Sequence, residues 1–277
     1  MTVAARPDHE VAATAIAEAF TAARRAGKAL PHYPGAIPDT LADAYAIQEK
    51  AIALWARPIA GWKIGRIATP ALQARHAEER LAGPIFASSV LVAPAGERID
   101  FPVFAGGFAA VEAEFVIRVA RDADPAKTEW TVEEAAAIVG TMYGGIETAG
   151  SPLKTINDLG PTVVVSDFGN NSGLILGPEI QDWRARRFDE LACASHVAGR
   201  EAGSGFATSV PGGPLPALRF LLEHCARRGR PLTAGQYVST GAATGIHEIA
   251  AGEDARIVFP GYGEILCRAV AAMPEDA

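Results

Sequence analysis

Apolar and polar residues alternate along residues 111–120, and the rest of the chain can be organised around this stretch. The apolar residues recur at every second position: Val111, Ala113, Phe115, Ile117 and Val119. This period is typical of a strand with one face in a core, so Glu112 and Glu114 share the other face. Their Cα atoms are expected to lie about 6.5–7 Å apart, close enough for both carboxylates to reach one cation. The plainer alternative is the solvated face of an edge strand.

A third acid follows a second apolar run. Thr131 and Glu134 have the spacing of a capping box, which predicts a helix from Thr131 to about Gly140. The run after it leads to Glu147, and a strand–helix–strand path can bring Glu147 beside the first two acids. Neighbouring carboxylates repel unless a positive charge lies between them. The three acids therefore predict an oxygen cage, which favours Mg²⁺ or Mn²⁺ over zinc.

The remaining pattern predicts helices before residue 59 and mainly strands after it. Helical periodicity covers residues 10–29, 39–55, 71–80 and 214–228. Strand-like segments cover residues 89–120, 161–165, 174–177, 236–241, 255–259 and 264–270. This order predicts an α+β fold, with a helical N-terminal cap over residues 1–58 and a β-rich catalytic domain over residues 59–277.

Composition narrows the range of functions. The 277 residues are 49% hydrophobic, which supports a substantial core, and the net charge is −7. This acidic balance argues against nucleic acid or an anionic membrane as a partner. The three cysteines are widely spaced, which predicts buried thiols instead of a metal site. Without a signal peptide pattern or an apolar stretch of about 20 residues, we expect a cytoplasmic protein.

Two further segments carry candidate chemistry. Lys63 lies between Gly61 and Gly65, and these glycines permit the close approach of a ligand or of backbone. Lys63 is either a surface residue whose stem lies along apolar neighbours or an acid, base or anion anchor near the cage. Asp167 lies in a glycine- and asparagine-rich cluster over residues 166–173, which is either an ordinary turn or a set of backbone donors for a carboxylate ligand.

In their order along the chain, these segments resemble the fumarylacetoacetate hydrolase superfamily, most closely its 2-keto-4-pentenoate hydratase and 4-oxalocrotonate decarboxylase branch. The resemblance covers about residues 10–272. It is carried by Gly61-Trp62-Lys63-Ile64-Gly65, Glu112-x-Glu114, Glu147, the Asp167 turn, the helix after Pro214, Val238-Ser239-Thr240-Gly241 and Pro260-Gly261-Tyr262-Gly263-Glu264.

The resemblance implies a mixed β-barrel or β-roll body, as in the C-terminal part of fumarylacetoacetase, and a homo-oligomer. It implies that Glu112, Glu114 and Glu147 hold Mg²⁺ or Mn²⁺ and that Lys63 is the catalytic residue near the substrate. Substrate binding is expected at the remaining residues of the pocket: Ser239, Thr240, Gly241 and Asp167.

One segment departs from the family pattern. The hydratases carry an acid in an Asp-Phe-Gly or Asp-Tyr-Gly context, whereas this chain has Leu81-Ala82-Gly83. The usual proton-transfer partner is therefore missing. Glu78, Glu79 and His76 are the nearby candidates to replace it.

The resemblance implies an enzyme that acts on a small 2-oxo acid, with a divalent ion that stabilises enolate charge. The leading hypothesis is a hydratase that adds water to a 2-hydroxy-2,4-dienoate in aromatic or related catabolism. The alternatives are a decarboxylase of a 4-oxalocrotonate-type diacid and a hydrolase of acylpyruvate C–C bonds. A different class is a weakly active subunit that supports a partner enzyme in a hydratase/decarboxylase complex.

Overall fold

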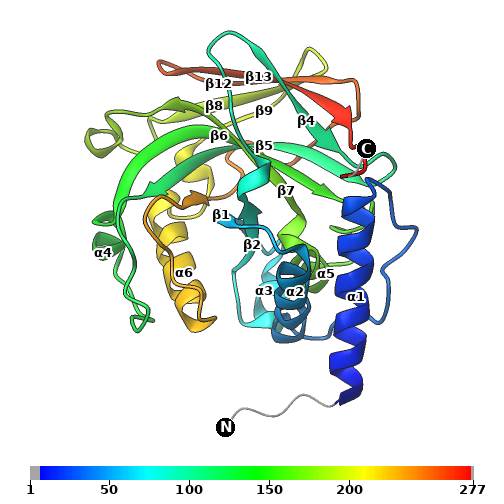
Figure 1. The fold of residues 1–277 in the computed structure, drawn as a ribbon. Coiled ribbons are helices and arrows are strands. Elements are labelled where there is room, and N and C mark those ends of the chain that lie inside the picture. Colours follow the sequence, from blue (N-terminus) through cyan, green and yellow to red (C-terminus); the bar gives the residue numbers. More distant parts are fainter. Residues whose placement is uncertain (1–6, 276–277) are drawn as a thin grey trace.

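The computed structural model describes residues 7–275, which form two β-sheets and a set of helices (Figure 1). The α-helices are α1 (Pro7–Arg25), α2 (Leu41–Trp55), α3 (Pro70–His76), α4 (Val132–Ala136), α5 (Pro161–Ser166) and α6 (Pro214–Arg227). Strands of the larger sheet are β1 (Ile59–Arg66), β2 (Arg80–Phe86), β3 (Val90–Val92), β5 (Phe108–Val119), β6 (Val139–Ser151), β7 (Asn171–Glu179), β10 (Tyr237–Ser239) and β11 (His247–Glu248). Those of the smaller sheet are β4 (Arg98–Val103), β8 (Ala192–Val197), β9 (Arg200–Phe206), β12 (Asp254–Phe259) and β13 (Gly263–Ala271).

The larger sheet is mixed and strongly curled. Its strand order is β2-β1-β10-β5-β6-β7-β3, with β11 paired to β5. The long strands β5 and β6 form its antiparallel centre, whereas β1 runs parallel to β10. In Figure 1 this sheet curves over the helices. The curvature directs side chains from separate strands toward one interior region.

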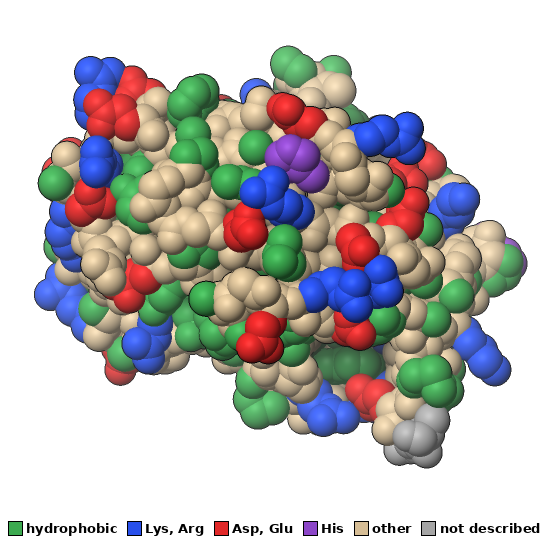
Figure 2. All heavy atoms as spheres, turned by 90° about the horizontal axis from the view of Figure 1, so that it is seen from above, with side chains coloured by type: hydrophobic (Ala, Val, Ile, Leu, Met, Phe, Trp, Pro, Cys, Tyr) green, Lys and Arg blue, Asp and Glu red, His purple; other side chains and the backbone are tan. Residues whose placement is uncertain are grey.

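The smaller sheet covers the outer side of the larger one. Its order is β4-β13-β12-β8-β9, and Figure 1 shows it above β5 and β6. Phe115 of β5 packs edge to face on Phe259 of β12, with ring centroids 5.7 Å apart. Figure 2, which looks onto the molecule from above, shows acidic and basic side chains interspersed on that face.

The N-terminal helices pack into the same hydrophobic core as the sheets. Phe20 of α1 and Ile47 of α2 belong to the cluster that also contains Phe115. Within the described residues the helical portion is therefore a layer of one packed unit, and the boundary at residue 58 stays a prediction. Among residues 7–275, no helix has both the length and the apolar character needed to cross a membrane.

Helix caps are the local features that the sequence predicts best. Thr40 caps α2 by accepting a hydrogen bond from the backbone of Asp43, and Thr131 and Glu134 form a complete capping box on α4. Several predicted helices extend too far: α3 ends at His76, α4 at Ala136 and α1 at Arg25.

The prediction of a strand at residues 161–165 is wrong. This segment is the buried helix α5, Pro161–Ser166. Its β-branched residues favour a strand by propensity, but Pro161 occupies the first helical turn, where a missing N–H costs little. Val163 and Val165 are fully buried, so tertiary packing outweighs the intrinsic preference.

Candidate metal centre and cavity

Four neighbouring strands of the larger sheet carry five of the predicted site residues: Lys63, Glu112, Glu114, Glu147 and Ser239. Lys63 on β1 is the register partner of Ser239 on β10, and β10 pairs in turn with β5. On the other side of β5, Glu112 lies directly opposite Glu147 of β6. The order β1-β10-β5-β6 thus brings together residues that lie far apart in the sequence.

Glu112, Glu114 and Glu147 form a buried cage. One carboxylate oxygen from each lies within 4.8 Å of the others. Glu114 and Glu147 are completely buried, and Glu112 is 6% exposed. The edge-strand alternative is therefore excluded, since β5 lies between β10 and β6.

Hydrogen bonds from described residues reach only one oxygen on each of two cage residues. Glu114 Oε2 accepts hydrogen bonds from the Ser239 hydroxyl and the Gly241 backbone N–H. Glu147 Oε1 accepts one from the Asn171 amide at 3.1 Å. Glu114 Oε1 and Glu147 Oε2 have no hydrogen-bond partner among the described residues. Buried acceptors are almost always satisfied, so these oxygens fit a hard divalent cation.

Lys63 is the cation nearest the cage. Its Nζ lies 3.2 Å from Glu147 Oε1, and its side chain is 6% exposed. Burial lowers the pKa of Lys63, but Glu147, Glu112 and Glu114 together outweigh burial and hold the pKa above its ordinary value. The surface alternative for this lysine is excluded by its burial. Lys63 is therefore the basic side chain that faces the three carboxylates.

Burial and mutual repulsion raise the pKa of two cage carboxyls. For Glu112 the causes are burial and then Glu147, opposed by Lys63. For Glu114 they are burial, Glu147 and Glu112, opposed by the hydrogen bonds from Ser239 and Gly241. The single positive charge of Lys63 does not balance three carboxylates. Such a set is typical of a metal or catalytic site.

A cavity of about 420 Å³ opens beside the cage, which is within the size range of small-molecule sites. Lys63 and Glu112 line it on the side of the cage. Arg66 and Arg80, which are cross-strand partners on β1 and β2, also line it. These four are the titratable side chains among its described lining residues. Leu81 lines the same cavity, so the position of the missing acid is an apolar part of the wall.

The Ser239-Thr240-Gly241 segment lies at the cage, as the resemblance implies. Ser239 and Gly241 hold Glu114, whereas the Thr240 hydroxyl donates to the Phe115 carbonyl at 2.7 Å. Thr240 and Gly241 line the cavity. Ser239 therefore orients a cage residue, and its neighbours form the wall.

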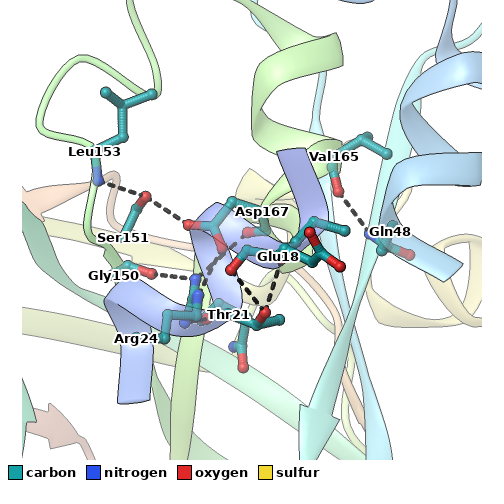
Figure 3. Close-up of polar contacts among 11 residues, drawn as sticks. Glu18, Thr21, Arg24, Gln48, Gly150, Ser151, Leu153, Val165 and Asp167 are labelled. Atoms are coloured by element: carbon teal, nitrogen blue, oxygen red, sulfur yellow. Dashed lines mark hydrogen bonds and ion pairs between the residues drawn. The ribbon is translucent and has the colours of Figure 1, made fainter. Parts of the chain in front are cut away.

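Asp167 does not lie among the residues that line the cavity. Its Oδ1 accepts a hydrogen bond from Arg24 Nε at 2.6 Å, and its Oδ2 accepts one from the Ser151 hydroxyl at 2.6 Å (Figure 3). Both side chains of the Arg24–Asp167 ion pair are almost fully buried. The expected substrate contact by Asp167 is thus replaced by an internal ion pair to α1.

The candidates to replace the missing acid lie elsewhere. Glu78 and Glu79 line a separate surface hollow with Arg80. His76 ends α3, and none of the three lines the cavity beside Lys63. The structure therefore brings no acid from this segment to the cavity.

Two asparagines were not singled out from the sequence. Asn171 donates to Glu147, and Asn170 lines the cavity with its side chain almost fully buried. The signal for them was the Asn170-Asn171 pair after Gly169, because asparagine tolerates the left-handed backbone of tight turns. The prediction of a turn does not by itself show which way the two amides point.

No protein-family profile matches the chain. Its fold, however, is similar to the folds of several solved structures. The chain is similar to 4-oxalocrotonate decarboxylase from Pseudomonas putida G7, complexed with magnesium and adipate. The TM-score is 0.76 and the identity 20%, over 93% of this chain and 97% of that chain. It is also similar to fumarylpyruvate hydrolase from Pseudomonas aeruginosa in complex with Mn²⁺ and pyruvate, with a TM-score of 0.56 and 16% identity over 76% of this chain and 89% of that chain.

A third similar structure is 5-carboxymethyl-2-hydroxymuconate delta-isomerase from Mycobacterium smegmatis, with a TM-score of 0.54 and 16% identity over 77% of this chain and 80% of that chain. The resemblance predicted from the sequence is thereby confirmed as far as the fold, which the chain shares with these solved structures. The predicted α+β architecture with a helical N-terminal portion is confirmed as well.

Proposed function

We propose that this protein is a divalent-metal-dependent enzyme that acts on a small 2-oxo acid. The observation that carries the proposal is the buried cage, with unpartnered oxygens on Glu114 and Glu147, beside a cavity that contains Lys63. The neighbours complexed with magnesium or Mn²⁺ support it. Glu112, Glu114 and Glu147 would hold Mg²⁺ or Mn²⁺, which when bound supplies Lewis-acid stabilisation of negative charge on substrate oxygens.

The residues of the chain supply binding and proton transfer. Lys63, Arg66 and Arg80 give the cavity a positive lining, which attracts the carboxylate of an acid substrate. The protonated Nζ of Lys63 can donate to an oxygen on which negative charge develops. The apolar wall at Leu81 keeps water away from that part of the substrate. A positioned acid of this kind typically contributes 10²–10⁴-fold to the rate.

Of the candidate reactions of a 2-oxo acid, decarboxylation requires the fewest proton-transfer groups in the cavity. In a 2-oxohex-3-enedioate the bond to the far carboxylate breaks, and CO₂ leaves. The electron pair shifts through the conjugated system to the 2-oxo oxygen, which takes a proton from Lys63 and becomes the hydroxyl of a dienol. One proton carrier suffices. We therefore propose decarboxylation of an unsaturated 2-oxo diacid as the reaction.

Addition of water to a 2-hydroxy-2,4-dienoate is the second candidate. It needs a proton delivered to one carbon and a water positioned at another, which are two separate tasks. Leu81 stands where the hydratases carry the acid for one of them. The observation that favours hydration is the polar part of the cavity lining, to which Asn157, Asn170 and Ser209 belong, because side chains of these types can hydrogen-bond a water.

Product analysis separates the candidates. Purified protein with Mg²⁺ is mixed with 2-oxohex-3-enedioate and, separately, with 2-hydroxypenta-2,4-dienoate, with EDTA controls and with the Glu147→Gln variant. The proposal expects CO₂ release from the first substrate that EDTA and the variant abolish. Water gained by the second substrate instead would establish the hydratase. Inactivity on both substrates would favour acylpyruvate hydrolysis or a supporting subunit. A separate measurement, light scattering, tests the expected homo-oligomer.

A further inference from the structure

The cavity beside the cage has a positively charged end. Its lining includes Arg66, the last residue of β1, and Arg80, the first residue of β2. These two arginines are direct partners in the antiparallel ladder. Because the rise along a strand is about 3.3 Å per residue, the Cα atoms of Lys63 and Arg66 lie about 10 Å apart. Lys63 is buried and Arg66 is exposed, so the lining runs from the cage outward to the arginines.

The guanidinium group of Arg80 is held at the cavity wall. Its Nη2 donates a hydrogen bond to the Pro211 carbonyl at 2.8 Å, and Pro211 also lines the cavity. The Arg80 side chain is 13% exposed, whereas Glu79, which lies 3.6 Å from its Nη1, is 71% exposed. Burial lowers the pKa of Arg80; Glu79 opposes this effect, but Arg219 and Arg66 add to it. Arg66 therefore lies close enough to Arg80 for the two positive charges to repel.

Arg66 lacks an anionic partner in the part of the chain that the structure describes. No acidic side chain among residues 7–275 forms an ion pair with it, and Glu112 of the cage is the one acid among the lining residues. Like charges directly opposite each other destabilise a sheet, and an anion between the arginines would offset this repulsion. Guanidinium groups bind carboxylates through paired N–H donors. The end of the cavity away from the cage is thus suited to a carboxylate.

We propose that Arg66, supported by Arg80, binds the carboxylate that a 2-oxo diacid carries at the end remote from its 2-oxo group. The inference rests on the proposed function, because it requires the 2-oxo end of the substrate to lie at the metal cage. With that end at the cage, the second carboxylate extends along β1 toward Arg66. Arg66 then selects a diacid over a monoacid of the same length.

The ion pair at Arg66 should act on binding more than on the chemical step. During decarboxylation the remote carboxylate loses its negative charge as it becomes CO₂, so its attraction to a guanidinium group weakens toward the transition state. Only interactions that strengthen in the transition state raise kcat. Loss of Arg66 should therefore raise KM and leave kcat unchanged or higher.

The binding test uses two saturated ligands of equal length, 2-oxohexanedioate and 2-oxohexanoate, which differ by one carboxylate. In calorimetry with Mg²⁺-loaded protein, the wild type should bind the diacid roughly five- to tenfold more tightly, whereas Arg66→Gln should bind both ligands alike. With 2-oxohex-3-enedioate as substrate, the variant should show KM raised by a similar factor.

The matched control is Arg75→Gln, which removes the same charge. Arg75 is exposed on α3 and is not among the residues that line the cavity, so the control should keep the diacid preference and KM. Both variants are expected to keep Tm within about 4 °C of the wild type.

Equal binding of the two ligands by the wild type would overturn the inference, as would a diacid preference that persists in Arg66→Gln or falls equally in Arg75→Gln. A lower kcat at unchanged KM in Arg66→Gln would also overturn it, since it would place Arg66 in the chemical step. The proposed function is tested separately by 2-oxohexanoate, which lacks the second carboxylate. If EDTA leaves binding of this ligand to the wild type unchanged, the proposed function is rejected, and the inference with it.

Discussion

Glu112 and Glu147 are direct partners in the antiparallel ladder between β5 and β6, and both side chains are buried. Like charges in this position destabilise a sheet. With Glu114 as the third carboxylate and Lys63 as the neighbouring cation, the cluster retains an excess of acidic groups. The arrangement is one that a divalent cation stabilises.

Metal binding should therefore stabilise the folded protein. At a Mg²⁺ or Mn²⁺ concentration about a hundred times Kd, we expect Tm to rise by about 5–10 °C over the EDTA-treated protein. Glu112→Gln and Glu147→Gln should each lose most of this rise, and all metal-dependent turnover, because each removes a charged ligand. Differential scanning fluorimetry and circular dichroism measure the rise and the integrity of the fold. Metal affinity equal to that of the wild type in both variants would refute the cage.

Lys63→Ala should lower kcat by about 10²–10⁴-fold, because it removes the proton carrier of the cavity. The affinity for Mn²⁺ should change far less, since the three carboxylates stay in place. Steady-state kinetics and calorimetry measure the two quantities. Lys50→Ala, which alters an exposed ion pair with Glu10, is the control. Wild-type kcat in Lys63→Ala would remove this lysine from the mechanism.

Leu81→Asp should restore an acid to the cavity wall. If the absence of this acid disfavours hydration, the variant should gain water addition to 2-hydroxypenta-2,4-dienoate relative to CO₂ release from 2-oxohex-3-enedioate. Leu81→Asn has a similar size and polarity without the acid, so it should leave the ratio of the two activities unchanged. Mass spectrometry of the products gives the ratio. The same ratio in both variants would show that the residue at this position does not select the reaction.

His224 should make the fold sensitive to mild acid. Burial, then Arg228 and Arg227, lowers its pKa to about 3, and the rings of Tyr45 and Phe220 pack against it. Because the folded-state pKa lies below the unfolded value of about 6.5, the unfolded chain takes up the proton first. The stability that His224 contributes is present above about pH 6.5 and is lost as the pH falls toward 3.

Between pH 7 and pH 5, this residue should lower the free energy of unfolding by about 2 kcal/mol. His224→Gln should show that much less pH dependence in urea denaturation over the same range. An identical slope for wild type and variant would mean that His224 titrates normally in the folded protein.

The core of the candidate site could be predicted from the sequence because it depends on a simple period. Alternation along β5 placed Glu112 and Glu114 on one face, and the second apolar run led to Glu147. Periodicity within a strand does not give the register between two strands. The register between β5 and β6 places Glu112 directly opposite Glu147. The assignment of Lys63 likewise needed the resemblance, since a lysine between glycines is ordinarily a surface residue.

The errors have a common physical origin in long-range packing. Residues 161–165 are β-branched, but their burial in α5 decided their structure. Asp167 lies in a turn that looked suited to a ligand, and its partner Arg24 is 143 residues away, at the end of α1. An arginine in the last turn of a helix normally interacts with the helix dipole. The sequence around Arg24 therefore does not indicate that it forms a buried ion pair.

We propose above all that Glu112, Glu114 and Glu147 hold the divalent ion used by the enzyme. The most direct measurement is an anomalous difference map from a crystal soaked with Mn²⁺, recorded with and without 2-oxopentanoate. We expect a peak bound by Glu112, Glu114 Oε1 and Glu147 Oε2 at about 2.0–2.4 Å, with the 2-oxo acid in the adjoining cavity. Strong Mn²⁺ density elsewhere, with the cage empty, would contradict it.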